Sequence, residues 1–69
     1  MKIKYFRDID VLNIEIQEGA FKYSEEPAEG IIFDISEDGE ILSIEVLDAI
    51  KRFGKPVAER MIKKYMTTA

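Results

Sequence analysis

A stretch of acidic residues between positions 34 and 45 has the spacing of a calcium-binding loop. It matches the EF-hand template at Asp34, Ser36, Asp38, Gly39, Glu40, Ile41 and Glu45. Oxygen ligands at this spacing suit calcium, but the loop works only between two helices that fold the ligands around one ion. Both flanks here alternate as strands do. We therefore predict an acidic hairpin turn, and the alternative is a weak surface site for calcium or magnesium at Asp34, Asp38 and Glu40.

Pairs of neighbouring carboxylates could perform acid–base chemistry of the kind that glycosidases use. The pairs are Asp8 with Asp10, Glu25 with Glu26, and Glu37 with Asp38. They lie in predicted turns, where solvent surrounds them, and a small sheet offers no obvious cleft in which carboxylates could be buried together. We expect these residues to make turns and solvate the surface.

The residue types that activate a nucleophile are missing. The chain has no histidine and no cysteine, which removes the commonest general base, the commonest transition-metal ligand and thiol chemistry. The hydroxyl residues have no histidine beside them, and neither a phosphate-binding glycine loop nor a dinucleotide fingerprint occurs. We predict a protein that is not an enzyme, without catalytic, cofactor-binding or metal-ligating residues.

Length and composition bound the fold. We expect the 69 residues to form a single domain, residues 1–69. The composition is 46% hydrophobic and 35% charged, which is typical of a globular protein. A chain this short has a marginal core, so either packing is efficient or a second copy adds buried area. The lack of cysteine suits a reducing cytoplasm. No apolar run is long enough for a membrane span, and the start MKIKYF lacks a signal-peptide core. We expect a soluble, cytoplasmic protein.

The net charge of −4 hides an asymmetry between two segments. Residues 1–47 carry four basic against twelve acidic residues, which gives −8, and the rest of the chain carries six against two, which gives +4. The simplest interpretation is a basic helical segment (residues 48–66) beside an acidic sheet, both solvated. Alternatively, one segment contacts the other, within or between protomers. Nucleic acid is an unlikely partner for Lys63, Lys64 and their basic neighbours, because the acidic sheet would repel phosphates.

Hydrophobic periodicity predicts two hairpins. Residues 31–35 and 41–47 are rich in branched residues, and they flank the Asp38-Gly39 pair, which favours a tight antiparallel turn. Residues 2–6 and 11–16 alternate as well and should pair with each other. Residues 20–26 alternate more weakly, so we expect a short edge strand there, ended by Pro27.

The chain from Asp48 onward is expected to be helical. Asp48 is a candidate N-cap for a short helix over residues 49–53 that Gly54 closes, and Pro56 suits the first residue of a second helix. The apolar stripe of this helix is Val57, Ala58, Met61, Ile62, Tyr65 and Met66. The tail 67–69 should fray. The predicted fold is α+β: an antiparallel meander of four strands, or five with the edge strand, and a short helical turn with a C-terminal amphipathic helix packed on one face.

A core follows from these patterns. Its predicted members are Ile3, Tyr5, Leu12, Ile14, Ile16, one face of residues 31–35, Leu42, Ile44, Val46, Ile50, Phe53, Val57, Met61, Ile62 and Tyr65. The run Ile31-Ile32-Phe33 is apolar on both faces of its strand. If a helix covers one face, a partner molecule must cover the other, which indicates a homodimer.

Two blocks of the sequence resemble a known prokaryotic family. They are MKIKYFRDIDVLNI (Met1 to Ile14) and EGIIFDISEDGEILSIEVLDA (Glu29 to Ala49), and they are similar to the domain of unknown function 2283 family over about residues 1 to 53. Departures from its pattern are Phe6 in place of aspartate, Ser43 in place of glycine and Ile50 in place of serine. The resemblance implies a small α+β protein and adds no catalytic or binding residues.

The combined expectation is a non-enzymatic protein–protein interaction module that acts as a homodimer. One alternative is an antitoxin-like component in which the acidic sheet neutralises a small basic partner protein, and the resemblance implies a partner of that size. The other is a divalent-metal-binding protein that uses the acidic turn between Asp34 and Glu40.

Overall fold

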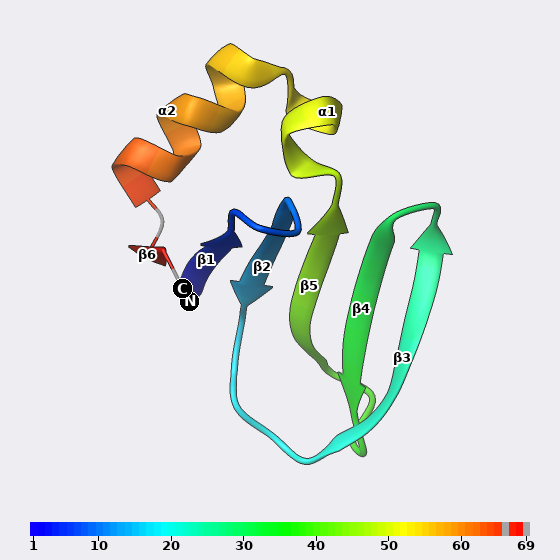
Figure 1. Ribbon diagram of the computed structural model, residues 1–69. Coiled ribbons are helices and arrows are strands. Elements are labelled where there is room, and N and C mark those ends of the chain that lie inside the picture. The colour runs from blue at the N-terminus through cyan, green and yellow to red at the C-terminus, as the bar shows by residue number, and fades with distance from the viewer. Residues whose placement is uncertain (66, 69) are drawn as a thin grey trace.

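The computed structural model describes residues 1–65 and 67–68. The chain folds as a five-stranded antiparallel sheet followed by two short helices, with a final two-residue strand at one edge (Figure 1). The elements are β1 (Lys2–Phe6), β2 (Val11–Glu15), β3 (Phe21–Ala28), β4 (Ile31–Ser36), β5 (Ile41–Leu47), α1 (Ala49–Phe53), α2 (Lys55–Tyr65) and β6 (Thr67–Thr68). The predicted α+β class and its antiparallel sheet are confirmed, and the optional fifth strand is present as β3.

The strand order across the sheet is β3-β4-β5-β2-β1-β6. The N-terminal hairpin and the β3–β4–β5 run are each contiguous in sequence, and they join where β5 pairs antiparallel with β2. The connection between β2 and β3 therefore passes the ends of β5 and β4 (Figure 1). Because β5 lies in the middle of the sheet, the helices that follow it begin at the centre of one sheet end.

The central hairpin turns at Gly39, as predicted. Gly39 has φ +83°, and its N–H donates to the carbonyl of Ser36 at 2.9 Å. The Ser36 N–H donates to the carbonyl of Glu40 at 2.9 Å, and the Ser36 hydroxyl accepts the Glu40 N–H at 3.1 Å. Strands flank both sides of this turn, so the EF-hand arrangement of two helices does not form.

Strand pairing gives the sheet one apolar face. Tyr5 lies opposite Leu12, Leu12 opposite Val46, and Val46 opposite Ile31. The next row on the same face is Ile3, Ile14, Ile44 and Phe33, which we call the apolar row. Side chains alternate between faces along a strand. The other face, which we call the polar face, carries Lys2, Lys4, Asn13, Glu15, Asp34, Ser43 and Glu45, together with the half-buried apolar residues Phe6, Val11, Ile32 and Leu47.

The main buried cluster lies at the sheet end where the helices sit, and Ile35 is buried separately near the Gly39 turn. Tyr5, Leu12, Val46 and Ala49 form the buried cluster, with Leu12 fully buried at 0% exposure. Ala58 of α2 is buried too. Both helices lie beyond this end of β1, β2 and β5 and leave the opposite end of the sheet uncovered in Figure 1. The helical segment therefore covers one end of the apolar face.

Several predicted core residues are exposed instead. Ile16 is exposed because the N–H groups of Ile16 and Gln17 both donate to the carbonyl of Leu42, at 2.8 and 3.2 Å, which ends the regular alternation after Glu15. Phe53 and Val57 are exposed because the helices lie at the sheet end rather than across the sheet. The side chains of Met61, Ile62 and Tyr65, and residue Met66, lie outside the described part of the structure.

Three predicted boundaries were wrong. β3 continues through Pro27 to Ala28, because an edge strand tolerates a residue without an N–H, and a register shift accompanies it between Glu25 and Ala28. α2 begins at Lys55, one residue before Pro56. Thr67 and Thr68 pair in parallel with Lys4 and Tyr5 as β6, where a frayed tail was expected.

No helix within residues 1–65 is long and apolar enough to cross a membrane.

Truncating the centre of the core tests this assignment. We expect Leu12→Ala to lower the free energy of unfolding by about 2–5 kcal/mol, because it removes a fully buried side chain and leaves a cavity. Ile16→Ala, four residues away on an exposed position, should cost under about 1 kcal/mol. Urea unfolding followed by circular dichroism measures both, and equal losses would contradict the assignment of Leu12 to the core.

Candidate interaction surface

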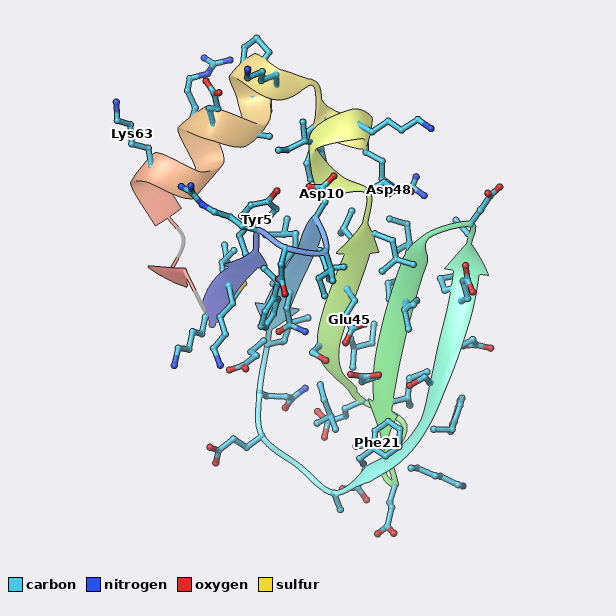
Figure 2. The ribbon with its side chains drawn as sticks, in the orientation of Figure 1. Tyr5, Asp10, Phe21, Glu45, Asp48 and Lys63 are labelled. Atoms are coloured by element: carbon cyan, nitrogen blue, oxygen red, sulfur yellow. The ribbon has the colours of Figure 1, made fainter. Side chains whose placement is uncertain are left out.

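The carboxylate of Asp10 holds the first helix against the sheet. Asp10 lies in the turn between β1 and β2 with φ 53°, and it accepts a 2.7 Å hydrogen bond from the Tyr5 hydroxyl. The same carboxylate accepts the Ile50 N–H at 3.1 Å, and the Asp10 carbonyl accepts the Ala49 N–H at 3.0 Å. Figure 2 shows Tyr5 and Asp10 together at the sheet end beside α1. The first amide groups of α1 are thus satisfied by a residue forty positions away.

This arrangement corrects the predicted N-cap. Asp48 precedes α1 as expected, but it has a left-handed backbone with φ 53° and makes no side-chain hydrogen bond to the helix. A left-handed residue aims its side chain away from the first helical turn, since N-cap geometry requires an extended backbone. The capping carboxylate therefore comes from the neighbouring hairpin.

Tyr5 is chemically distinguished by its contact with Asp10. The hydrogen bond to the carboxylate raises the pKa of the Tyr5 phenol above its usual value, and burial and the negative charge of Asp10 act in the same direction. The neutral phenol is the form that donates to Asp10. The pair therefore stabilises the fold as long as Tyr5 keeps its proton.

Arg52 fixes the other side of α1. Its Nε donates to the carbonyl of Leu47 at 3.0 Å, and its guanidinium also donates to the carbonyl of Glu29. The guanidinium lies over Gly30, where a Cβ would clash with Nη2 of Arg52. Gly30 has φ +79° and donates its N–H to the Glu26 carboxylate at 2.9 Å. Asp10 and Arg52 together tie α1 to both hairpins at the same end of the sheet.

Because α1 is held at this end, the apolar row is left only half-buried. Ile3, Ile14, Ile44 and Phe33 lie one row further from the helices than Tyr5, Leu12 and Val46, and each is partly exposed. The row crosses four neighbouring strands without a charged side chain. It continues directly from the buried cluster, against which Ile3, Ile14 and Ile44 pack. This row is the candidate interaction surface.

The polar residues of the polar face contact one another, and Ile32 lies among them opposite Glu45. Lys4 and Glu15 form an ion pair at 3.2 Å between the paired strands β1 and β2. Asp34 accepts hydrogen bonds from the Ser24 and Ser43 hydroxyls, both at 2.7 Å. An open hollow of about 570 Å³ at the edge of this face is lined in part by Lys2, Glu15 and Asp34, and its charges of both signs converge on no common point.

The structure separates the acidic residues that could have bound a cation. Asp34 lies on β4 and bonds the two serines, whereas Asp38 and Glu40 lie exposed in the turn. Within the described residues, no three acidic side chains come together as ligands. Of the carboxylate pairs, Asp10 and Glu26 bond backbone amides, and Asp8, Glu25, Glu37 and Asp38 are exposed. The serines and acids that sequence reasoning considered thus have structural partners or face solvent.

The basic C-terminal segment makes no ion pair with the acidic sheet in the part of the chain that the structure describes. Arg52, the basic residue that reaches the sheet, bonds backbone carbonyls. The hypothesis that the two segments attract each other within one protomer is therefore not supported by its contacts.

Sequence reasoning missed the roles of Asp10 and Arg52. The spacing of Tyr5 and Asp10 within one hairpin offers a weak local signal for their hydrogen bond. No local pattern links Asp10 to Ile50 or Arg52 to Glu29, because these contacts depend on which strands become neighbours.

Comparison with known proteins identifies one family. Residues 2–49 match the family model described as "protein of unknown function (DUF2283)". No curated protein and no solved structure matches the chain. The matched residues include both hairpins and the capping residue Asp10, and end at the first residue of α1.

The Asp10 contact can be tested by substitution. We expect Asp10→Ala to lower the free energy of unfolding by about 1–3 kcal/mol, because it leaves the Tyr5 hydroxyl and the Ile50 N–H without their acceptor. Asp10→Asn keeps one side-chain oxygen and tolerates the positive φ, so its loss should be smaller. Urea unfolding compares the two, and a loss below about 0.5 kcal/mol for Asp10→Ala would show that the contact does not hold the helix.

The raised pKa of Tyr5 predicts a fall in stability at alkaline pH. The unfolded chain releases this proton near pH 10, whereas the folded chain holds it to higher pH. Above about pH 10 the unfolded state therefore binds fewer protons, and the free energy of unfolding decreases as pH rises through the folded-state pKa. Tyr5→Phe should reduce this decrease, since the other tyrosines are common to both chains. Unfolding curves at pH 8, 10 and 11 give the free energy of unfolding of both chains as a function of pH. An equal decrease in wild type and Tyr5→Phe would refute the linkage.

Proposed function

Since the chain belongs to the family of proteins of unknown function matched by residues 2–49, we propose a role from its own surface: a cytoplasmic, non-enzymatic interaction module that acts as a homodimer. The observation that carries this proposal is the half-buried apolar row of Ile3, Ile14, Ile44 and Phe33. The row is continuous with the core and is left uncovered because the helices sit at one end of the sheet.

The exposed area of the chain supports a partner. The chain exposes 4903 Å², whereas a compact monomer of 8.0 kDa would expose about 4,450 Å². The side chains responsible include large apolar residues such as Ile16 and Tyr23, which are exposed at the uncovered end. A domain of this size has little stability to spare, so covering more apolar area would benefit it.

The chemistry of the row favours a second copy as the partner. A two-fold contact brings the same patch of both chains together, so a charged patch would meet like charge, whereas an uncharged patch meets itself without penalty. The apolar row is formed by three isoleucines and one phenylalanine. Two such sheets would pack face to face about 10 Å apart, as in a β-sandwich.

The residue content supports a role without catalysis. The chain has no histidine or cysteine, and the hydroxyls of Ser24 and Ser43 both donate to Asp34. No histidine is present to activate either serine, and the one carboxylate beside them, Asp34, is shared by both hydroxyls. Assays for hydrolysis are therefore expected to show no turnover above background.

Sedimentation equilibrium at micromolar concentration tests the homodimer. We expect the wild-type chain to sediment at no less than twice its monomer mass of 8.0 kDa. Ile44→Thr, which keeps a β-branched side chain but adds a hydroxyl to the row, should weaken association by about tenfold or more in dissociation constant. Glu45→Gln, on the next residue and the opposite face, should leave association unchanged.

A clean 8 kDa species for the folded wild-type chain would overturn the homodimer. If that chain instead recovers a stoichiometric small basic protein from native extract, the antitoxin-like alternative replaces it. Calorimetric titration with calcium, magnesium and manganese tests the metal-binding alternative, for which the separated carboxylates of Asp34, Asp38 and Glu40 predict no binding tighter than millimolar.

A further inference from the structure

Strand β3 leaves one edge of the sheet open along its full length. All of Phe21–Ala28 is exposed, with Phe21 at 58% and Tyr23 at 46% of their full exposure. β3 pairs with β4 on one side only, whereas β1, near the opposite edge, pairs with β6 through Lys4 and Tyr5. An edge strand carries unpaired backbone N–H and C=O groups that another strand can satisfy. Figure 1 shows β3 at the side of the molecule away from both helices.

The pairing register picks out a short regular segment within β3. Tyr23, Ser24 and Glu25 pair in succession with Ile35, Asp34 and Phe33 of β4. Register shifts flank this segment, between Phe21 and Tyr23 and between Glu25 and Ala28. The regular part of the open edge is therefore centred on Ser24.

Two charged residues of β3, Lys22 and Glu26, lie symmetrically about the same residue. In an antiparallel pairing of two β3 strands centred on Ser24, residues whose numbers sum to 48 lie opposite one another. Lys22 then lies opposite Glu26 of the second copy, and this ion pair occurs twice. The second oxygen of the Glu26 carboxylate is available for it, because Oε2 accepts the Gly30 N–H. Opposite charges in directly facing positions stabilise a strand pair.

We propose that β3 pairs with β3 of a second copy across a two-fold axis at Ser24, with Lys22 facing Glu26 at both ends. Tyr23 of one copy then lies opposite Glu25 of the other and diagonally across from its Tyr23, within reach of an aromatic ring. This contact covers an aromatic side chain that is otherwise exposed. The partner is the same chain, since the complementarity of Lys22 and Glu26 is internal to one strand.

Features that usually protect an edge strand from pairing with other chains limit the length of this contact. Pro27 lacks an N–H, and the two register shifts bend the strand on either side of the regular segment. They limit regular pairing to Tyr23–Glu25, with Lys22 and Glu26 at the two ends of that segment, where the register shifts begin. A contact of that length is specific in register and closes after two chains, because each chain has one such edge.

The edge contact is separate from the apolar row. Pairing of edges requires a two-fold axis perpendicular to the sheet, whereas packing of apolar faces requires an axis parallel to it. Together the two contacts would join four chains in a closed assembly when the axes intersect. Either contact can exist without the other, so their tests are independent.

Reversing single charges tests the pairing. Lys22→Glu places Glu opposite Glu26, and Glu26→Lys places Lys opposite Lys22, so each variant alone should associate through this edge about tenfold more weakly than wild type. The double variant with both substitutions restores opposite charges and should recover wild-type association. An equimolar mixture of the two single variants should also associate, as mixed pairs.

Sedimentation velocity of each chain over a concentration series is the readout, with thermal unfolding to confirm that each variant is folded. The same set of variants is repeated in the Ile44→Thr background. This substitution weakens the apolar-row contact, which could otherwise hide a loss of association through β3. Recovery in the double variant and in the mixture supports the proposal. It is overturned if the single variants associate like wild type, or if neither the double variant nor the mixture recovers. If Ile44→Thr leaves association unchanged while the charge series behaves as expected, the apolar-row contact of the proposed function falls and the homodimer forms through β3.

Discussion

A carboxylate in one turn determines where the helices of this protein sit. Asp10 accepts the hydroxyl of Tyr5 and the first amides of α1, so the turn between β1 and β2, the start of the sheet and the start of the helical segment meet at one group. Buried amide groups at a helix N-terminus need acceptors, and here the neighbouring hairpin supplies both a carboxylate and a carbonyl. Arg52 adds a second connection to the turn at Gly30.

Holding the helices at the sheet end has a consequence for the rest of the molecule. Tyr5, Leu12 and Val46 are buried, whereas the next row on the same face is half-buried. A helix lying across the sheet would bury both rows and leave few apolar side chains exposed. The apolar row and the open edge at β3 are the two surfaces of the sheet on which the proposed contacts between copies rest.

The acidic residues are explained by local structure. The turn from Ser36 to Glu40 is held by backbone hydrogen bonds and by the Ser36 hydroxyl, so its acids remain in solvent. Asp34 accepts hydrogen bonds from Ser24 and Ser43 on the polar face. The EF-hand spacing binds calcium when it lies between two helices, so ligand spacing has meaning only together with the backbone that arranges the ligands.

Short-range patterns were sufficient for the elements of this protein. Alternation with a period of two predicted the strands around Gly39 and the N-terminal pair at residues 2–6 and 11–16, and Gly54 marked the break between the helices. These features depend on residues that are close in sequence, so the amino-acid order contains them. Strand order, the capping of Ile50 by Asp10 and the exposure of Ile16, Phe53 and Val57 were decided only by the tertiary structure. Each of these depends on which distant segments become neighbours, and the free energy of such contacts is shared among residues that no local pattern connects.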